Sequence, residues 1–345
     1  MTDKPIARLA VIGLGMATKP HLEALTELRG RVAVSGVFNR TRAKAEAVQE
    51  TYGFPLFDSL DAIAADPGTD GVIIATPPNQ RADIVAQMAG AGKHILMEKP
   101  VERSLAAAQD IVGVCEAAGV TLGIVFQHRF RAGARRLRAL INDGALGDLA
   151  LVRAEIPWWR GQDYYDIPGR GTYARDGGGV LISQAIHVLD LMLSLTGPAR
   201  AVQALTGTTA LHRMEAEDFA TAGIEFASGA LGSVVATTAT YPGEVERLVL
   251  DGTKATAVLT GGQLRVTWRD GRTEELGETA GTGGGADPMA FPCDWHRDLI
   301  EQFAGAITTG ASPRIPGREA LRVHALIDAM VRSGADGQLA DVEVV

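Results

Sequence analysis

Short apolar segments alternate with helical stretches through the first third of this chain, and this alternation limits the folds open to it. The segments are Leu9–Ile12, Val32–Phe38, Asp70–Ala75, His94–Met97 and Val120–Val125, and the first four end at glycine or at a polar turn. Such apolar runs are typical of strands buried on both faces, and alternation with helices is typical of parallel pairing. The pattern predicts a doubly wound parallel sheet over residues 1–125.

The first segment leads into a glycine turn, Gly13-Leu14-Gly15-Met16-Ala17-Thr18, before a helix that opens near Pro20. Glycines let the backbone approach a pyrophosphate, whose charge is stabilised by the N–H groups at the helix start. Thr18 replaces the third glycine of the usual motif, so a plain strand-to-helix turn is the alternative. We expect Gly13, Gly15, Met16 and Ala17 to bind a dinucleotide in a Rossmann domain.

The second segment is followed by Asn39, near where dinucleotide-binding domains place an acid that binds the adenosine ribose. Asn39 is neutral, and Arg40, Arg42 and Lys44 follow it. Guanidinium groups suit phosphate, so we expect NADP, with NAD as second choice. The run also resembles the NRTxxK-type loop with which shikimate dehydrogenases hold the 2′-phosphate of NADP. Incidental basic residues at a solvated helix start are the alternative.

A lysine stands where the fourth segment ends, in Glu98-Lys99-Pro100. Open parallel sheets bind ligands beyond the carboxyl ends of their strands, where Thr76-Pro77 also follows the third segment. We therefore expect Lys99 to face a ligand crevice, with Thr76, Pro77 and Glu98 at the cofactor. An exposed loop lysine is the alternative.

Composition restricts the class of protein. The 345 residues suggest about two domains. A formal charge of −8 argues against a broad nucleic-acid surface, and no apolar run is long enough to span a membrane. The two cysteines, Cys115 and Cys293, form no disulfide framework or metal pair. We expect a cytoplasmic protein with no metal-ligand cluster.

The alternation stops near residue 126, and residues 126–345 predict a second α+β domain. Strand-like segments separated by glycine-containing turns indicate an open, mainly antiparallel sheet; they are Leu149–Ile156, Asp218–Phe226, Ala230–Tyr241, Arg247–Asp251 and Gln263–Trp268. Residues 281–285 predict a loop, and helices are expected over Trp295–Ile307 and from Gly317. On the first of these helices, His296 is expected at the surface, and an approach of His296 to the site is the alternative.

A glycine triplet at residues 177–179 precedes a helix that carries Ser183, His187 and Asp190. Glycines permit a ligand to approach the backbone closely, and Ser183 and His187 lie four residues apart on one helical face. His187 is therefore a candidate catalytic residue, and Asp190 is close enough in sequence to contact it. A core histidine with satisfied hydrogen bonds is the alternative.

Aromatic and basic residues are concentrated before this helix, although the chain is only 5% aromatic. Flat rings with polar edges suit a sugar, and arginine binds carboxylate or phosphate. The candidate substrate-binding residues here are Trp159, Arg160, Tyr164, Tyr165 and Arg170. A cluster at a domain interface is the alternative.

The glycine turn, Ala75-Thr76-Pro77 and Glu98-Lys99-Pro100, in this order, resemble the Gfo/Idh/MocA family of NAD(P)-dependent oxidoreductases over nearly the whole chain. The resemblance implies that Lys99 lies beside nicotinamide and substrate, and that His187 is an acid/base. It also implies sugar or polyol substrates and a homodimer or homotetramer. Arg81 stands where many members have histidine, and Ser183 where many have Asp or Asn.

We therefore expect hydride transfer between NADP and a carbinol carbon of a sugar or polyol, with Lys99 and His187 as catalytic residues. Lys99, Ser183 and His187 are also expected to bind the substrate. A partly desolvated lysine beside a cationic nicotinamide is expected to have a lowered pKa, which suits proton exchange. The alternatives are a non-catalytic NAD(P)-binding regulator, and a dehydrogenase of a dihydrodiol, cyclitol or nucleotide-linked sugar.

Overall fold

The structure is a computed structural model that describes residues 7–278 and 292–345. The chain divides into two compact units. The first contains residues 1–102, 106–126 and 292–320, and the second contains residues 103–105, 127–291 and 321–345. The predicted loop at 281–285 lies outside the described residues. The first unit therefore includes a late segment that the sequence boundary at residue 125 had assigned to the second domain.

A five-stranded sheet in the order β2-β1-β3-β4-β5 forms the centre of the first unit, and all its strand pairs are parallel. Its strands are β1 (Ala7–Ile12), β2 (Val32–Phe38), β3 (Gly71–Ile74), β4 (His94–Glu98) and β5 (Leu122–Val125). Strands β3 and β5 are buried along their whole length. The predicted doubly wound parallel sheet is confirmed.

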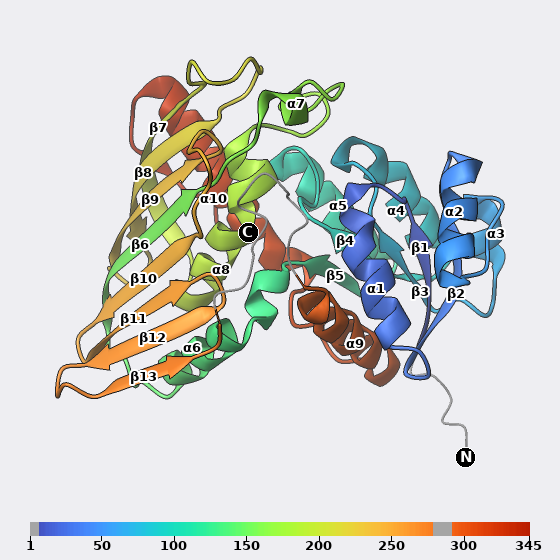
Figure 1. Ribbon diagram of the computed structural model, residues 1–345, viewed down its shortest axis with the longest axis horizontal. Coiled ribbons are helices and arrows are strands. Elements are labelled where there is room, and N and C mark those ends of the chain that lie inside the picture. Colours follow the sequence, from blue (N-terminus) through green and yellow to red (C-terminus); the bar gives the residue numbers. More distant parts are fainter. Residues whose placement is uncertain (1–6, 279–291) are drawn as a thin grey trace. The chain divides into compact units, whose positions relative to one another are not determined.

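Helices cover both faces of this sheet (Figure 1). Their bounds are α1 (Lys19–Glu27), α2 (Arg42–Tyr52), α3 (Leu60–Ala65), α4 (Arg81–Gly90), α5 (Leu105–Ala117) and α9 (Asp294–Thr309), with 3-10 turns at Met16–Thr18 and Pro78–Gln80. Helix α9 packs against α1 and contacts β1, β4 and β5. Beyond α9, the Ile124 amide donates to the Ile315 carbonyl, so the late segment also extends the sheet edge at β5.

The second unit contains a nine-stranded sheet in the order β13-β12-β11-β10-β6-β9-β8-β7-β14. Its strands are β6 (Leu149–Pro157), β7 (Ala199–Gly207), β8 (Phe219–Phe226), β9 (Leu231–Thr237), β10 (Arg247–Gly252), β11 (Ala255–Thr260), β12 (Gln263–Trp268), β13 (Thr273–Leu276) and β14 (Ala340–Asp341). Only β6 and β9 pair in parallel. The predicted mainly antiparallel sheet is confirmed, although the sequence did not predict β7, β11, β13 or β14.

Helices cover one face of this sheet (Figure 1). They are α6 (Ala132–Asn142), α8 (Ile186–Thr196) and the later part of α10 (Gly317–Asp336); α7 (Gln162–Tyr165) and the turns Gln127–Phe130 and Leu181–Ala185 complete the unit. The opposite face carries the exposed apolar side chains of Leu151, Leu205, Leu231 and Val235. Across the described residues, no helix combines the length and hydropathy needed to cross a bilayer.

Candidate functional site

The glycine turn after β1 uses its two glycines differently. Gly13 has φ +91°, and a Cβ there would lie 2.8 Å from Thr76 Cγ2, so this position is closed to other residues by backbone and packing together. A Cβ on Gly15 would meet nothing within 4 Å. Gly13 is therefore required by the fold, and Gly15 borders open space that a phosphate can enter.

Thr18 closes this turn in place of a third glycine. Its hydroxyl donates to the Gly13 carbonyl at 2.9 Å, and its side chain is buried. Met16 and Ala17 lie in the 3-10 turn between Gly15 and α1, where Met16 is exposed. The threonine is therefore compatible with the turn, because its hydroxyl satisfies a carbonyl of the same loop.

Asn39 fastens the end of β2 to the glycine turn. Its Oδ1 accepts from the Leu14 amide at 3.0 Å, and its Nδ2 donates to the Thr41 carbonyl at 3.1 Å. Arg40 is exposed, whereas Arg42 donates to the carboxylates of Glu46 and Asp58, which raise the pKa of Arg42. Of the two predicted arginines, Arg40 is the one not engaged by these carboxylates.

The turn after β3 offers a hydroxyl toward the same edge of the sheet. Thr76 Oγ1 is buried and makes no hydrogen bond within the described part of the chain. Buried hydroxyls normally have a partner. An orphaned hydroxyl next to Gly13, together with the open space at Gly15, fits a dinucleotide lying across the ends of β1 and β3.

Lys99 follows β4 and is half-buried. The side chain of the preceding residue, Glu98, is buried. One Glu98 oxygen lies 2.7 Å from His21 Nε2, and the other accepts the backbone N–H of Lys99 at 3.2 Å. Burial acts to raise the pKa of Glu98, but the hydrogen bond from His21 and electrostatic interactions with His21, His296 and Lys99 outweigh it. The pKa of Glu98 is therefore lowered, and the carboxylate stays ionised.

His296 was expected on a helix surface, and that expectation is wrong. Its side chain is 1% exposed, and its ring meets that of His21 edge-on with centroids 4.8 Å apart. Burial, aided by the charge of His21, lowers the pKa of His296 to about 3. Helix α9 brings His296 to this place, and no local feature of the sequence indicates it.

The sequence predicted no metal-ligand cluster, yet His21, Glu98 and His296 bring ligand atoms within 4.8 Å of one another in the described residues. The direct hydrogen bond between His21 and Glu98 accounts for this grouping without an ion. We therefore regard the three side chains as a buried polar support for the Lys99 turn.

In the second unit, the backbone of the glycine triplet at residues 177–179 lies close to the backbone of other segments. A Cβ on Gly179 would lie 1.7 Å from the Glu217 carbonyl oxygen, and one on Gly177 would lie 2.5 Å from Arg103 Cα. The Glu217 carboxylate accepts from the Gly179 amide at 3.1 Å and the Leu181 amide at 3.0 Å. Close packing against Arg103 and Glu217 thus accounts for Gly177 and Gly179, and ligand approach at the triplet stays a prediction.

Ser183 lies in the turn Leu181–Ala185, which is π-helical, and His187 lies in the first turn of α8. Single π-turns inside helices often occur at functional sites. His187 is 8% exposed and stacks on His128 with centroids 4.9 Å apart, and His128 Nε2 lies 2.5 Å from an Arg131 nitrogen. Since arginine only donates, His128 Nε2 is the acceptor.

Asp190 lies one turn beyond His187 in α8, and its carboxylate pairs with an arginine. Arg129 donates to both Asp190 oxygens, from Nε at 2.7 Å and from Nη2 at 2.6 Å, and both side chains are buried. This bidentate pair fixes α8 to the turn Gln127–Phe130.

The predicted substrate-binding residues upstream of α8 form one cluster. Tyr164 Oη accepts from Arg170 at 2.6 Å and from Gln184 at 3.3 Å, which connects it to the π-turn. Tyr165 is buried against Thr238, and burial raises its pKa. Arg160 is buried beside the Tyr164 ring, and Trp159 packs edge-on against Tyr241. Of Arg160, Tyr164, Tyr165 and Arg170, only Tyr164 and Arg170 remain partly accessible.

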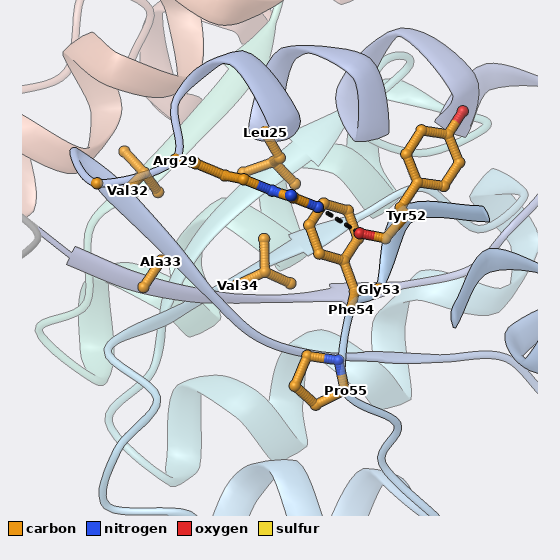
Figure 2. A pocket seen from close by; sticks show the side chains of 10 residues that line it. Leu25, Arg29, Val32, Ala33, Val34, Tyr52, Gly53, Phe54 and Pro55 are labelled. Carbon is orange, nitrogen blue, oxygen red and sulfur yellow. Dashed lines mark hydrogen bonds between the residues drawn. The ribbon is translucent and has the colours of Figure 1, made fainter. Parts of the chain in front are cut away.

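A surface hollow of about 370 Å³ lies elsewhere on the first unit (Figure 2). It is lined by Leu25, Arg29, Gly30, Val32, Ala33, Val34, Tyr52, Gly53, Phe54 and Pro55. Val32 to Val34 form the amino end of β2, whereas ligands of such sheets bind beyond the carboxyl ends of strands. The hollow is therefore not the candidate site.

Comparisons with known proteins agree with this arrangement. Residues 7–126 match the family described as oxidoreductase family, NAD-binding Rossmann fold, and residues 134–258 match the GFO/IDH/MocA C-terminal domain. A D-xylose 1-dehydrogenase (NADP(+)) from Haloferax volcanii is 29% identical over 90% of this chain and 92% of its own. An inositol 2-dehydrogenase from Rhizobium meliloti is 26% identical over 95% and 97%.

Among solved structures, the WlbA dehydrogenase from Bordetella pertussis, in complex with NADH and UDP-GlcNAcA, superimposes with a TM-score of 0.84. It is 28% identical, and the match covers 99% of this chain and 100% of that one. The similarity thus extends over both units.

Proposed function

Because this chain belongs to the Gfo/Idh/MocA family of oxidoreductases, we propose that it transfers a hydride between NADP and a carbinol carbon of a sugar or polyol. The observation that carries the proposal is the position of Lys99 at the carboxyl end of β4, where its backbone N–H donates a hydrogen bond to the buried Glu98 carboxylate. A nicotinamide accepts or supplies the hydride when it is bound.

Residues at the ends of β1 and β3 would hold the cofactor. The N–H groups after Gly13 and the open space at Gly15 suit a pyrophosphate, with Met16 and Ala17 in the first turn beyond. The orphaned Thr76 hydroxyl and the adjacent Pro77 would lie against it, with Glu98 supporting the Lys99 turn.

The preference for NADP over NAD rests on Asn39 and Arg40. Asn39 brings no negative charge to the ribose, and Arg40 is exposed directly beyond it, whereas Arg42 would have to leave Glu46 and Asp58. The Haloferax volcanii relative carries NADP(+) in its name, while the WlbA structure contains NADH. Fluorescence titration with both cofactors tests the preference, and tighter binding of NAD would contradict it.

Two side chains would exchange the hydroxyl proton of the substrate. In the oxidative direction, neutral Lys99 accepts this proton while His187 orients the hydroxyl; in the reductive direction, the ammonium of Lys99 returns the proton to the carbonyl oxygen. Ser183 provides no carboxylate for His187. Lys99 therefore has the larger share of the proton transfer.

Replacement of Lys99 tests this role. Lys99→Met keeps an unbranched side chain out to Cε and removes the amine, so we expect turnover to fall by about 10³-fold, within the range that general acid-base catalysis supplies. Binding of NADP, followed by fluorescence, should persist. Turnover at the wild-type rate would refute the role of Lys99.

A nucleotide-linked sugar is the second candidate substrate, favoured by the UDP-GlcNAcA in the WlbA complex. Tyr164 and Arg170 would take the sugar ring and its charged groups, since the Arg170 guanidinium lies 4.5 Å from the Tyr164 ring centroid and both side chains are partly accessible. A panel of free sugars, cyclitols, dihydrodiols and nucleotide-linked sugars, monitored by nicotinamide absorbance, would separate these classes.

The open face of the nine-stranded sheet would form a homodimer or homotetramer. Leu151 and Leu231 are register partners on β6 and β9, and both are exposed there together with Leu205 and Val235. Grouped apolar side chains on an exposed sheet face favour contact with a second copy.

A further inference from the structure

Arg81 is a fully buried cation beside the Lys99 turn. It is 2% exposed, at the first position of α4. Its Nε and Nη2 donate to the Thr76 carbonyl at 3.0 and 2.7 Å, and its Nη1 donates to the carbonyls of Glu98 and Pro100. One guanidinium thus joins the turn after β3 to both residues that flank Lys99.

Buried arginines are usually paired with a carboxylate, because an isolated charge is expensive to desolvate. Arg81 makes all its hydrogen bonds to main-chain carbonyls. Burial lowers its pKa to about 10, while the charges of Glu98 and Glu102 oppose this effect. It therefore stays protonated at neutral pH.

The side chain at this position must serve three carbonyl groups, and few residues can do so. Neutral histidine has one N–H donor and lysine is a point charge, whereas the guanidinium fork presents five N–H groups in fixed directions. A histidine or a lysine here would therefore leave part of these contacts unmade.

We propose that Arg81 is a positioning residue that fixes the main chain of Lys99 against the Thr76 turn and disfavours a second positive charge on the Lys99 amine. This inference rests on the proposed role of Lys99. Because Arg81 holds the carbonyl groups of Glu98 and Pro100, the backbone of Lys99 is fixed. The direction in which the Lys99 side chain points is thereby restricted. A fixed cation nearby favours the neutral amine, the form that accepts a proton.

Other charged groups also face this turn. Glu98 and Glu102 come from its own segment, His21 from α1 and His296 from α9, and Arg81 is the contribution of α4. Glu98 and Lys99 interact electrostatically, so the Glu98 carboxylate favours the ammonium form of Lys99, and removal of Arg81 removes a charge that opposes this effect. The acid limb of the pH profile of kcat/KM should then move to higher pH.

Two variants separate charge from geometry. Arg81→Gln removes both charge and fork, so we expect kcat to fall about 10- to 100-fold and the acid limb to rise by at least half a pH unit. Arg81→Lys keeps the charge without the fork, so kcat should fall while the acid limb stays near its wild-type pH. Arg332→Gln is the matched control, since Arg332 also donates to a main-chain carbonyl but lies in the second unit.

The outcomes are distinguishable. If Lys99→Met keeps wild-type turnover, the proposed function fails whatever Arg81 does. If Lys99→Met is inactive but Arg81→Gln keeps the wild-type pH profile and kcat, only this inference fails. If Arg81→Gln does not fold, Arg81→Lys decides: a lowered kcat with sugar KM within about threefold supports positioning, and a wild-type kcat overturns it.

Discussion

His21 Nε2 lies 2.7 Å from Glu98 Oε1, and the second Glu98 oxygen accepts the backbone N–H of Lys99. Helix α1, strand β4 and the residue proposed for catalysis are therefore connected through one buried carboxylate. The same helix begins directly after the glycine turn. Helix α1 thus both supports the Lys99 turn through His21 and borders the proposed pyrophosphate site.

Removal of His21 should destabilise the protein strongly. His21→Ala leaves Glu98 buried without this partner, so we expect the free energy of unfolding to fall by about 3–5 kcal/mol. Glu98→Gln should cost less, because its amide oxygen still accepts from Lys99. Urea unfolding of both variants and of the double variant measures their coupling, and independent, additive effects would contradict a direct interaction.

The two glycines of the turn should respond differently to alanine. Gly13→Ala meets Thr76 and requires a positive φ, so we expect a loss of stability of about 1–3 kcal/mol. Gly15→Ala meets no atom, so the thermal midpoint should be unchanged while the Kd for the cofactor rises. Thermal unfolding and fluorescence titration check both, and unchanged cofactor binding by Gly15→Ala would refute the phosphate site.

Acidification should destabilise the protein through His296. This side chain is neutral in the folded protein, with a pKa of about 3, and has an ordinary pKa near 6.5 when unfolded. Between these values the unfolded state binds more protons, so stability falls as pH falls, by up to about 1.4 kcal/mol per pH unit. His296→Phe keeps a ring without titration. Denaturant unfolding at pH 7 and pH 4.5 should show a smaller loss in this variant than in wild type.

An acid at Asn39 should reverse the cofactor preference. Asn39→Asp keeps the acceptor for the Leu14 amide but places a negative charge where the 2′-phosphate is expected. We expect the ratio of the Kd for NADP to the Kd for NAD to rise at least about tenfold, which corresponds to about 1.4 kcal/mol. Arg40→Ala should weaken NADP binding alone. Equal losses for both cofactors in Arg40→Ala would contradict phosphate recognition.

A charge on the open sheet face should disrupt self-association. Leu231→Arg places a cation opposite Leu151, so we expect a smaller assembly in analytical ultracentrifugation. Val114→Arg, on an exposed position of α5, is the control and should leave the sedimentation coefficient unchanged. A wild-type protein that sediments as a monomer would exclude this use of the face.

The sequence was sufficient where the signal is local. The turn at Gly13 and Gly15 and the position of Lys99 after β4 follow from hydrophobic runs and their punctuation, and the parallel sheet follows from their alternation. These features depend on neighbours along the chain, which hydrophobic periodicity and turn chemistry describe well.

It failed where partners come from far along the chain. Glu217 caps the helix start at Gly179, 38 residues away in sequence, and Arg129 pairs with Asp190, 61 residues away. Helix α9 buries His296 against the ring of His21. None of these contacts has a spacing rule, so the sequence did not predict that Glu217 caps this helix start or that His296 is buried. Only the tertiary fold determines which of several polar residues each one meets.

The position of α9 in the first unit has a consequence for the order in which this protein can mature. A nascent chain that ends at residue 126 contains every strand of the parallel sheet but not the helix that lies over β1, β4 and β5. The strands of the nine-stranded sheet up to β13 precede α9 in the chain, so the ribosome synthesises them before it synthesises α9. We therefore expect the nucleotide-binding half to be one of the last parts of the molecule to gain its native solvent protection.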